Sequence, residues 1–170
     1  MSLPIHEQHQ QQAPVSLAVA VITVSDTRTA ETDTGGQTVI DHLQAAGHQL
    51  AARHIIKDDP GPMRELLLQL AERSEIAAIL LTGGTGISSR DQTFETVSAL
   101  LEKPLPGYGE LFRQLSYAEI GPAAILSRAT GGVMRGKVVL TMPGSPNGVR
   151  LAMEKIIIPQ LRHLVREAGR

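Results

Sequence analysis

The sequence contains no cysteine and no tryptophan, and aromatic residues of any kind are scarce. Without cysteine the protein cannot form disulfides, zinc–thiolate sites, iron–sulfur clusters or a cysteine nucleophile. The two Phe and two Tyr all fall between Phe94 and Tyr117, so the core must be built from aliphatic side chains. We expect this aromatic segment to lie at a subunit contact or a pocket rim, outside the core.

Long apolar runs are also missing. The longest, residues 17–22 and 76–81, are far too short to span a membrane, and residues 1–15 have neither the basic start nor the apolar centre of a secretory signal. Charge is nearly balanced, with 16 Lys and Arg against 17 Asp and Glu, which argues against a nucleic-acid-coating chain. We therefore expect a cytoplasmic protein that binds neither membranes nor nucleic acid.

The length of 170 residues suits one domain, which we place at residues 16–170 behind a flexible tail of residues 1–15. Strands are expected at residues 17–24, 50–56, 76–81, 130–134 and 137–142. Helices are expected at residues 37–46, 59–73, 93–101, 110–119, 122–128 and 147–166, the last kinked at Pro159, with a loop at 102–109. This alternation predicts an α/β fold, a three-layer αβα sandwich whose central sheet is mostly parallel. Ligands bind such sheets at the carboxyl edge of the strands.

Residues 82–86 (TGGTG) directly follow the third expected strand. Three glycines in five residues (Gly83, Gly84 and Gly86) let backbone N–H groups turn toward an anion, and the hydroxyls of Thr82 and Thr85 add donors. No lysine follows, so this is not a Walker A loop, and the spacing differs from the dinucleotide-binding fingerprint. A tight strand-to-helix connection needs fewer glycines, so the composition favours anion binding.

Two acidic residues, Asp33 and Asp91, lie in loops before expected helices. Each could be the N-cap of its helix. Asp91 could instead bind a metal or a polar heterocycle. Because phosphate chemistry without a nearby lysine needs Mg²⁺ to offset charge, two acids beside a glycine loop favour a metal-assisted phosphate site.

A rigid turn, residues 143–146 (PGSP), follows the last expected strand. The Ser145 hydroxyl and the start of the final helix could bind an anion there, and a plain turn is an equally good interpretation. Arg128 could pair with a phosphate or with a surface acid.

Taken together, these motifs resemble the molybdopterin-binding proteins of molybdenum cofactor biosynthesis. The resemblance rests on TGGTG at 82–86, the Arg90-Asp91 pair and PGSP at 143–146, and it covers residues 15–166. Residues 107–113 (GYGELFR) and 116–121 (SYAEIG) resemble the protein B branch of that family.

The resemblance implies a molybdopterin-binding-domain fold, assembly as a homotrimer or homohexamer, and transfer of AMP from Mg-ATP to the terminal phosphate of molybdopterin with release of pyrophosphate. It implies hand-over of the product to a molybdenum-insertion protein. It also implies catalytic roles for Asp33 and Asp91, with Mg²⁺ on Asp33. Cofactor binding would fall to Ser25, Thr82, Gly83, Gly84, Thr85, Gly86, Pro143, Gly144 and Ser145.

Two positions depart from the family pattern. Gly35 stands where a serine is preferred, which removes a hydroxyl donor near Asp33, and Phe94 stands where many members have a helix-starting proline. The first departure keeps an alternative open, a non-catalytic molybdopterin carrier or scaffold of the same pathway.

Overall fold

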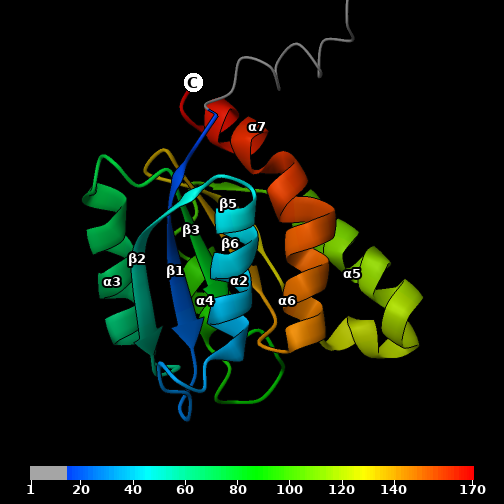
Figure 1. Ribbon diagram of the computed structural model, residues 1–170. Coiled ribbons are helices and arrows are strands. Elements are labelled where there is room, and N and C mark those ends of the chain that lie inside the picture. Colours follow the sequence, from blue (N-terminus) through cyan, green and yellow to red (C-terminus); the bar gives the residue numbers. More distant parts are fainter. Residues whose placement is uncertain (1–14) are drawn as a thin grey trace, which may run out of the picture.

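A six-stranded sheet with the order β2-β1-β3-β6-β5-β4 organises residues 15–170, the part of the chain that the computed structural model describes (Figure 1). Its strands are β1 (Ala18–Val24), β2 (Gln49–Ile56), β3 (Ala78–Thr82), β4 (Lys103–Pro104), β5 (Gly131–Met134) and β6 (Lys137–Met142). Strands β2, β1, β3 and β6 are parallel to one another, whereas β5 runs antiparallel to β6 and β4 antiparallel to β5. The predicted mostly parallel sheet is confirmed.

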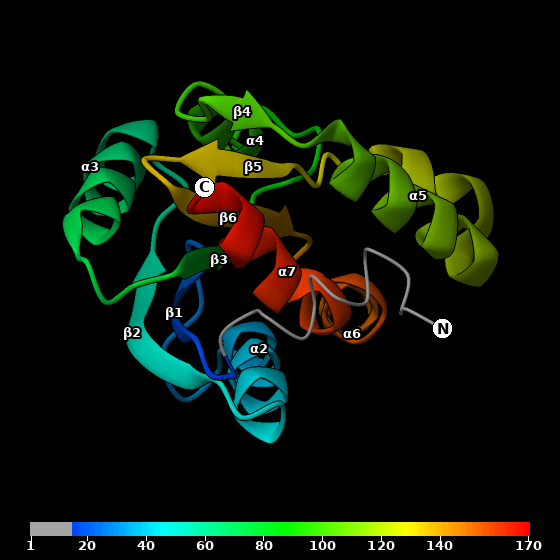
Figure 2. The ribbon, with the colours of Figure 1, turned by 90° about the horizontal axis from the view of Figure 1, so that it is seen from above.

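Helices cover both faces of the sheet (Figure 2). They are α2 (Thr34–Ala45), α3 (Pro60–Glu72), α4 (Thr93–Ser98), α5 (Pro106–Ile120), the 3₁₀ helix η1 (Gly121–Leu126), α6 (Pro146–Ala152), the π-helical turn η2 (Met153–Ile157) and α7 (Ile158–Ala168). One aliphatic core joins the sheet to α2, α5 and the α6–η2–α7 segment, and a second joins it to α3 and α4. The three-layer αβα prediction is therefore confirmed.

The central strands have no solvent-facing side because each supplies both cores. In β1, Val19 and Val21 face the core under α2, while Ala20 and Ile22 face the core under α3. Every residue of β3 is buried. An unbroken apolar run is what a parallel strand covered on both faces requires.

The helix boundaries follow capping chemistry. Asp33 is the N-cap of α2, its carboxylate accepting from the Gly36 N–H, so the helix starts three residues earlier than the pattern predicted. Gly47 ends that helix with a φ of 80°, a conformation that favours glycine. Asp59 caps α3 and Pro60 occupies its first turn, as expected.

The carboxy-terminal helix is interrupted where the sequence predicted a kink. The Ile158 N–H donates to the Met153 carbonyl, five residues back, which makes η2 a π-helical turn just before Pro159. A proline ring crowds the preceding turn and has no N–H to donate. The wider turn accommodates the ring and lets the helix continue as α7.

The prediction of a loop at residues 102–109 is wrong. Lys103 and Pro104 pair with β5, and α5 begins at Pro106, because proline is well suited to the first helical turn. Gly109 is required for packing: a Cβ there would lie 2.4 Å from the Ala129 carbonyl oxygen. The helix expected at 122–128 is the 3₁₀ helix η1.

The aromatic residues also depart from expectation in part. Tyr108 and Phe112, both on α5, are buried in the core beside α6, and the Tyr108 hydroxyl donates to the Thr141 carbonyl. Burial raises the pKa of Tyr108. Phe94 is half-buried and Tyr117 is 61% exposed, so only these two lie outside the core.

The topology selects one edge of the sheet for ligands. From β1 the chain moves outward to β2 and then returns past β1 to β3, so the strand order switches between β1 and β3. The loops after β1, β3 and β6 leave the sheet at the same edge, at the bottom of Figure 1. Within the described residues, no helix is long and apolar enough to cross a membrane.

Phe112→Ala should lower the free energy of unfolding by about 3–5 kcal/mol, because it empties a fully buried site in the aliphatic core. Chemical denaturation at a fixed protein concentration measures this. The control Glu110→Ala, at an exposed position of the same helix, should change stability by less than about 0.5 kcal/mol. Equal effects of the two substitutions would contradict the packing described for α5.

Candidate functional site

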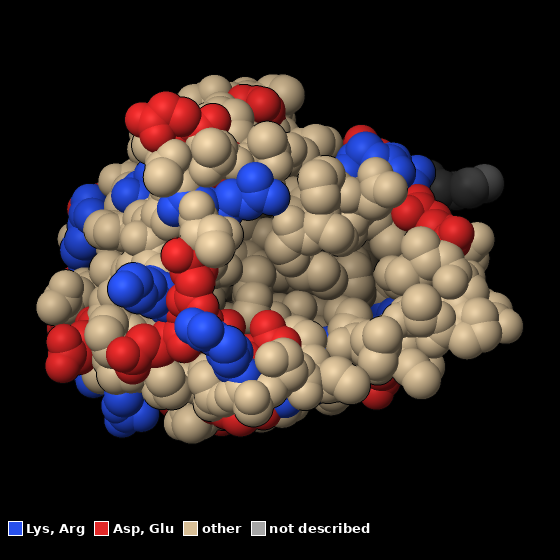
Figure 3. Space-filling model, turned by 90° about the horizontal axis from the view of Figure 1, so that it is seen from below, with Lys and Arg blue, Asp and Glu red and all other residues tan. Residues whose placement is uncertain are grey.

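Two adjoining cavities open at the carboxyl edge of the sheet. Figure 3 views the molecule from this side and shows a hollow among largely uncharged residues, with acidic and basic side chains gathered on one side of it. The β1 cavity, of about 70 Å³, is lined by Thr23, Val24, Ser25, Arg28, Asp33, Gly35, Thr82 and Gly144. The glycine-loop cavity, of about 330 Å³, is lined by Gly83, Gly84, Thr85, Gly86, Asp91, Ala123, Leu126, Ser127, Pro143 and Gly144. All sequence-predicted site residues except Ser145 line one of them.

The glycine loop can approach the sheet closely only because it lacks side chains. Gly83 has a φ of 101°, and a Cβ there would lie 2.2 Å from the Val24 carbonyl oxygen at the end of β1. Gly84 has a φ of 64°, and a Cβ there would lie 2.2 Å from the Thr93 hydroxyl and 2.4 Å from a carboxylate oxygen of Asp58. These two positions therefore require glycine.

The backbone N–H groups of the loop divide into two sets. The Gly83 N–H donates to the Met142 carbonyl and continues the sheet, and the Thr82 hydroxyl donates to the Pro143 carbonyl. No hydrogen bond within residues 15–170 uses the N–H groups of Gly84, Thr85 or Gly86. These three donors belong to residues that line the glycine-loop cavity, where they can bind an anion.

Asp33 is held inside the fold. One carboxylate oxygen accepts from the Gly36 N–H at 2.8 Å, and the other accepts from the Thr23 hydroxyl at 2.8 Å and from the Arg53 guanidinium at 3.1 Å. The side chain is 1% exposed. The N-cap interpretation is confirmed, and these contacts leave little of the carboxylate for a metal ion. The catalytic and magnesium-binding roles of Asp33 stay predictions.

Asp58 is an acidic residue next to the glycine loop that the sequence analysis missed. It follows β2, half-buried under the glycine loop, and its carboxylate accepts from the Gln92 N–H at 3.1 Å. Burial raises the pKa of Asp58, the Gln92 N–H partly opposes this, and the nearby charges of Asp91, Asp26 and Glu95 raise it further. Its position just beyond the strand predicted at residues 50–56 was the available signal.

Asp91 does not cap α4, because Gln92 occupies the N-cap position and makes no side-chain cap bond. The Asp91 carboxylate turns back into its own loop and accepts from the Ser88 N–H at 2.9 Å. It lines the glycine-loop cavity close to Gly86, where an added Cβ would lie 2.8 Å from one of its oxygens. The N-cap interpretation of Asp91 is therefore wrong.

The two serines of the site take local roles. The Ser25 hydroxyl accepts from the Thr27 and Arg28 N–H groups and shapes the turn after β1. Ser145 is the N-cap of α6, accepting from the Gly148 N–H, and it is exposed. The turn interpretation of residues 143–146 thus accounts for the Ser145 hydroxyl.

The acidic side chains near the site could hold Mg²⁺ only together with a ligand. Within residues 15–170, no group of three or more His, Asp or Glu side chains is arranged to hold a metal ion. Mg²⁺ commonly takes one or two carboxylates and completes its shell with phosphate oxygens and water. Asp58 and Asp91 fit that pattern, since each has a carboxylate oxygen that accepts no hydrogen bond from the described part of the chain.

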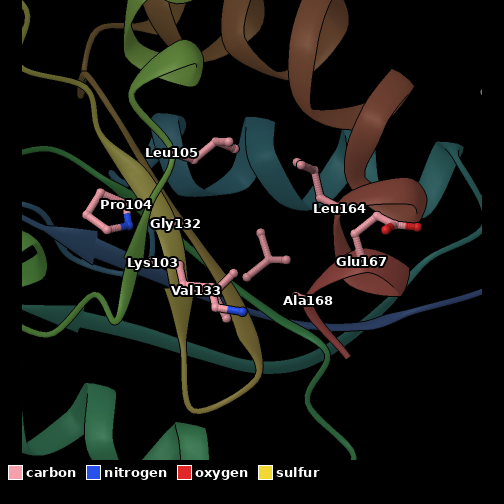
Figure 4. A pocket seen from close by; sticks show the side chains of 9 residues that line it. Lys103, Pro104, Leu105, Gly132, Val133, Leu164, Glu167 and Ala168 are labelled. Carbon is pink, nitrogen blue, oxygen red and sulfur yellow. The ribbon is translucent and has the colours of Figure 1, made fainter. Parts of the chain in front are cut away.

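A further cavity, of about 240 Å³, lies between β4, β5 and α7. Figure 4 shows its mostly apolar wall, with Leu105, Val133 and Leu164 on its sides and Lys103 and Glu167 at its margin. It contains none of the residues that the sequence predicted for ligand binding.

Comparison with known proteins gives a consistent result. Residues 20–163 match the family described as "Probable molybdopterin binding domain". Over 162 residues the chain is 50% identical to molybdenum cofactor biosynthesis protein B of Bacillus subtilis (strain 168), covering 95% of each. It also resembles a crystal structure of molybdenum cofactor biosynthesis protein B, with a TM-score of 0.89, 47% identity and coverage of 92% of this chain and 98% of that one. The tungsten cofactor synthesizing protein MoaB from Pyrococcus furiosus gives a TM-score of 0.83, 36% identity and coverage of 93% and 100%.

Gly84→Ala should lower the free energy of unfolding by about 1–3 kcal/mol, because the new methyl group meets Thr93 and Asp58 at a positive φ. The control Gly107→Ala, with no atom within 4 Å of the new Cβ, should leave stability unchanged or raise it by up to about 1 kcal/mol. Thermal and chemical denaturation compare the two. A Gly84→Ala protein as stable as the wild type would contradict the described loop.

Proposed function

Because the chain belongs to the molybdopterin-binding family, and within it to the molybdenum cofactor biosynthesis proteins B, we propose that it binds molybdopterin and adenylylates it with Mg-ATP. In this reaction an oxygen of the molybdopterin terminal phosphate attacks the α-phosphorus of ATP. A new phosphoanhydride bond forms, the bond from the α-phosphorus to the bridging oxygen breaks, and pyrophosphate leaves with that bond's electron pair.

The observation that supports this proposal most strongly is the wall of the glycine-loop cavity. It combines three N–H donors without partners in the described part of the chain, from Gly84, Thr85 and Gly86, with the carboxylate of Asp91. Asp58 lies directly beneath the loop. Fixed backbone dipoles next to carboxylates suit a ligand that carries phosphates and a divalent cation.

In the proposed reaction the main role of the protein is to position the charged phosphate groups. A phosphate monoester is largely ionised near neutral pH, so no side chain has to remove a proton from the nucleophile. The loop N–H groups would hold phosphate oxygens in fixed positions, which lowers the barrier by orientation and by electrostatic stabilisation.

Asp58 and Asp91 are the residues that we assign to Mg²⁺. When bound with ATP, the ion offsets the negative charge of the triphosphate and of the departing pyrophosphate. Asp33 would act beside them by holding Arg53 and the first turn of α2, as its three hydrogen bonds favour.

Asp58→Asn and Asp91→Asn should each lower the rate of AMP transfer at least about 100-fold, since each removes a charge proposed to hold the ion. Their free energy of unfolding should change little. Asp33→Asn should instead lower the free energy of unfolding by about 1–3 kcal/mol, because Arg53 loses a buried partner. Transfer from labelled ATP to molybdopterin, together with denaturation curves, separates the two effects, and Asp41→Asn on the surface of α2 is the control.

Two results would revise this assignment. If folded Asp33→Asn protein loses transfer while Asp58→Asn retains it, Asp33 is the catalytic acid that the family resemblance implied. If the wild-type protein binds molybdopterin tightly but never transfers AMP, the chain is a molybdopterin carrier or scaffold, the alternative suggested by Gly35. Gly35→Ser tests the missing hydroxyl, because a Cβ there makes only ordinary contacts, 3.4 Å to the Gly144 carbonyl oxygen.

The exposed apolar surface of α5 and η1 supports assembly with further copies of the chain, as a homotrimer or homohexamer. Its residues are Leu111, Tyr117, Ile120, Ile125 and Leu126, between 41% and 76% exposed. Leu126 also lines the glycine-loop cavity, so this surface is continuous with the site. We further propose a cytoplasmic location and hand-over of the product to a molybdenum-insertion protein.

Ile125→Glu should shift the protein from oligomer to monomer, because it places a charge in the apolar surface of α5 and η1. Light scattering after size-exclusion chromatography gives the mass directly. Gln44→Glu, at an exposed position of α2, is the control and should leave the mass unchanged. A monomeric wild-type protein, or an Ile125→Glu oligomer of unchanged mass, would contradict this contact.

A further inference from the structure

Arg128 lies in the connection between η1 and β5 and contacts the glycine loop. Its backbone N–H donates to the Thr85 carbonyl at 3.0 Å. Its guanidinium donates through Nε to the Gly86 carbonyl at 2.7 Å and through Nη2 to the Asp91 carbonyl at 3.1 Å. One residue thus holds three carbonyl groups of the segment from Thr85 to Asp91.

The guanidinium packs against α4. It lies over the Phe94 ring, 5.2 Å from the ring centre, and its Nη1 is paired with the Glu95 carboxylate. The hydrogen bond from Arg128 lowers the pKa of Glu95. Nε, Nη1 and Nη2 all have protein partners. The expected pairing of Arg128 with a surface acid is confirmed in Glu95, and the two contacts to loop carbonyls are an addition that the sequence did not indicate.

Each carbonyl that Arg128 binds also fixes the N–H group of the next residue, because the two belong to the same planar peptide group. In a trans peptide the C=O of one residue and the N–H of the next point in opposite directions. Holding the Thr85 carbonyl therefore turns the Gly86 N–H away from Arg128, and that N–H is one of the three without a partner in the described chain.

The third carbonyl connects Arg128 to Asp58. The Asp91 carbonyl shares its peptide plane with the Gln92 N–H, and this N–H donates to the Asp58 carboxylate at 3.1 Å. Arg128 and Asp58 thus bind opposite ends of one peptide group. A charged donor on the carbonyl polarises that group and strengthens the bond that its N–H makes.

We propose that the Arg128 side chain is a positioning residue. Its guanidinium holds the Gly86 carbonyl and the peptide that anchors Asp58, and it thereby keeps the loop in the shape in which the Gly86 N–H can bind a phosphate oxygen. The expected effect of Arg128 on the reaction rate rests on the proposed adenylyl transfer, whereas its expected effect on the order of the loop does not. Phe94, which stands where many family members have proline, supports the guanidinium in this chain.

Arg128→Lys tests the inference, because lysine keeps the charge and the backbone N–H but cannot reproduce the planar fork of contacts. Amide hydrogen exchange at residues 86–92 should become at least about 10-fold faster, while β1 and α2 keep their protection. The rate of AMP transfer should fall about 30- to 100-fold, the size of effect expected from misplaced reacting groups. Phe94→Leu should produce a smaller change of the same kind.

Glu95→Gln is the matched control, since it weakens the ion pair and leaves the three carbonyl contacts in place. It should keep both loop exchange and transfer within about 3-fold of the wild type. Wild-type loop exchange and wild-type transfer in Arg128→Lys would overturn the proposal, as would an equally large loss in Glu95→Gln.

The two proposals fail in different ways. If the wild-type protein transfers no AMP, adenylylation is wrong, whereas faster exchange confined to residues 86–92 in Arg128→Lys still supports positioning. If Arg128→Lys does not fold, Phe94→Leu carries the test, because its unchanged loop exchange would also overturn the role of the guanidinium.

Discussion

The close approach of backbone to backbone at the carboxyl edge of the sheet is the constraint on which the rest of the site depends. Gly83 abuts the last carbonyl of β1, and Gly144, after β6, abuts Gly83 in turn. Gly84 abuts Asp58, which follows β2. The ends of β1, β3 and β6 therefore meet through backbone alone, and the end of β2 joins them through the Asp58 carboxylate under Gly84. The polar backbone groups of this junction become the surface that a ligand can contact.

The sequence was sufficient for the fold because its signals are local and agree with one another. Unbroken apolar runs identified β1 and β3, and Asp59-Pro60 located the start of α3. The TGGTG motif located the cavity wall for the same reason, since three glycines have few other uses after a buried strand. Local signals gave the wrong prediction where long-range packing determines the structure. Gly109 resembles a loop residue in the sequence, but it lies in α5 and is glycine because the Ala129 carbonyl packs against it.

Asp58 shows why part of the site could not be predicted. In the sequence it stands before Asp59, whose capping role accounts for the acidic pair, and its position soon after a predicted strand is the only local signal. Its meaning depends on the order β2-β1-β3, which folds the end of β2 under a loop that begins more than twenty residues later. Asp33 shows the opposite case: its motif resembles a catalytic one, and only the fold reveals that its oxygens accept hydrogen bonds from Thr23, Gly36 and Arg53.

The contrast between these acids follows from where each charge is balanced. Asp33 is buried and neutralised by Arg53 within the protein, so its negative charge contributes little to the cavity. Asp58 and Asp91 have no such arginine among the described residues: Arg128 reaches them only through the peptide between Asp91 and Gln92, by binding its carbonyl. Burial raises the pKa of Asp58, and the nearby negative charges of Asp91, Asp26 and Glu95 raise it further. A divalent cation bound with phosphates, as proposed above, would offset this charge. An arginine that binds the backbone instead of these two carboxylates holds the loop without cancelling their charge.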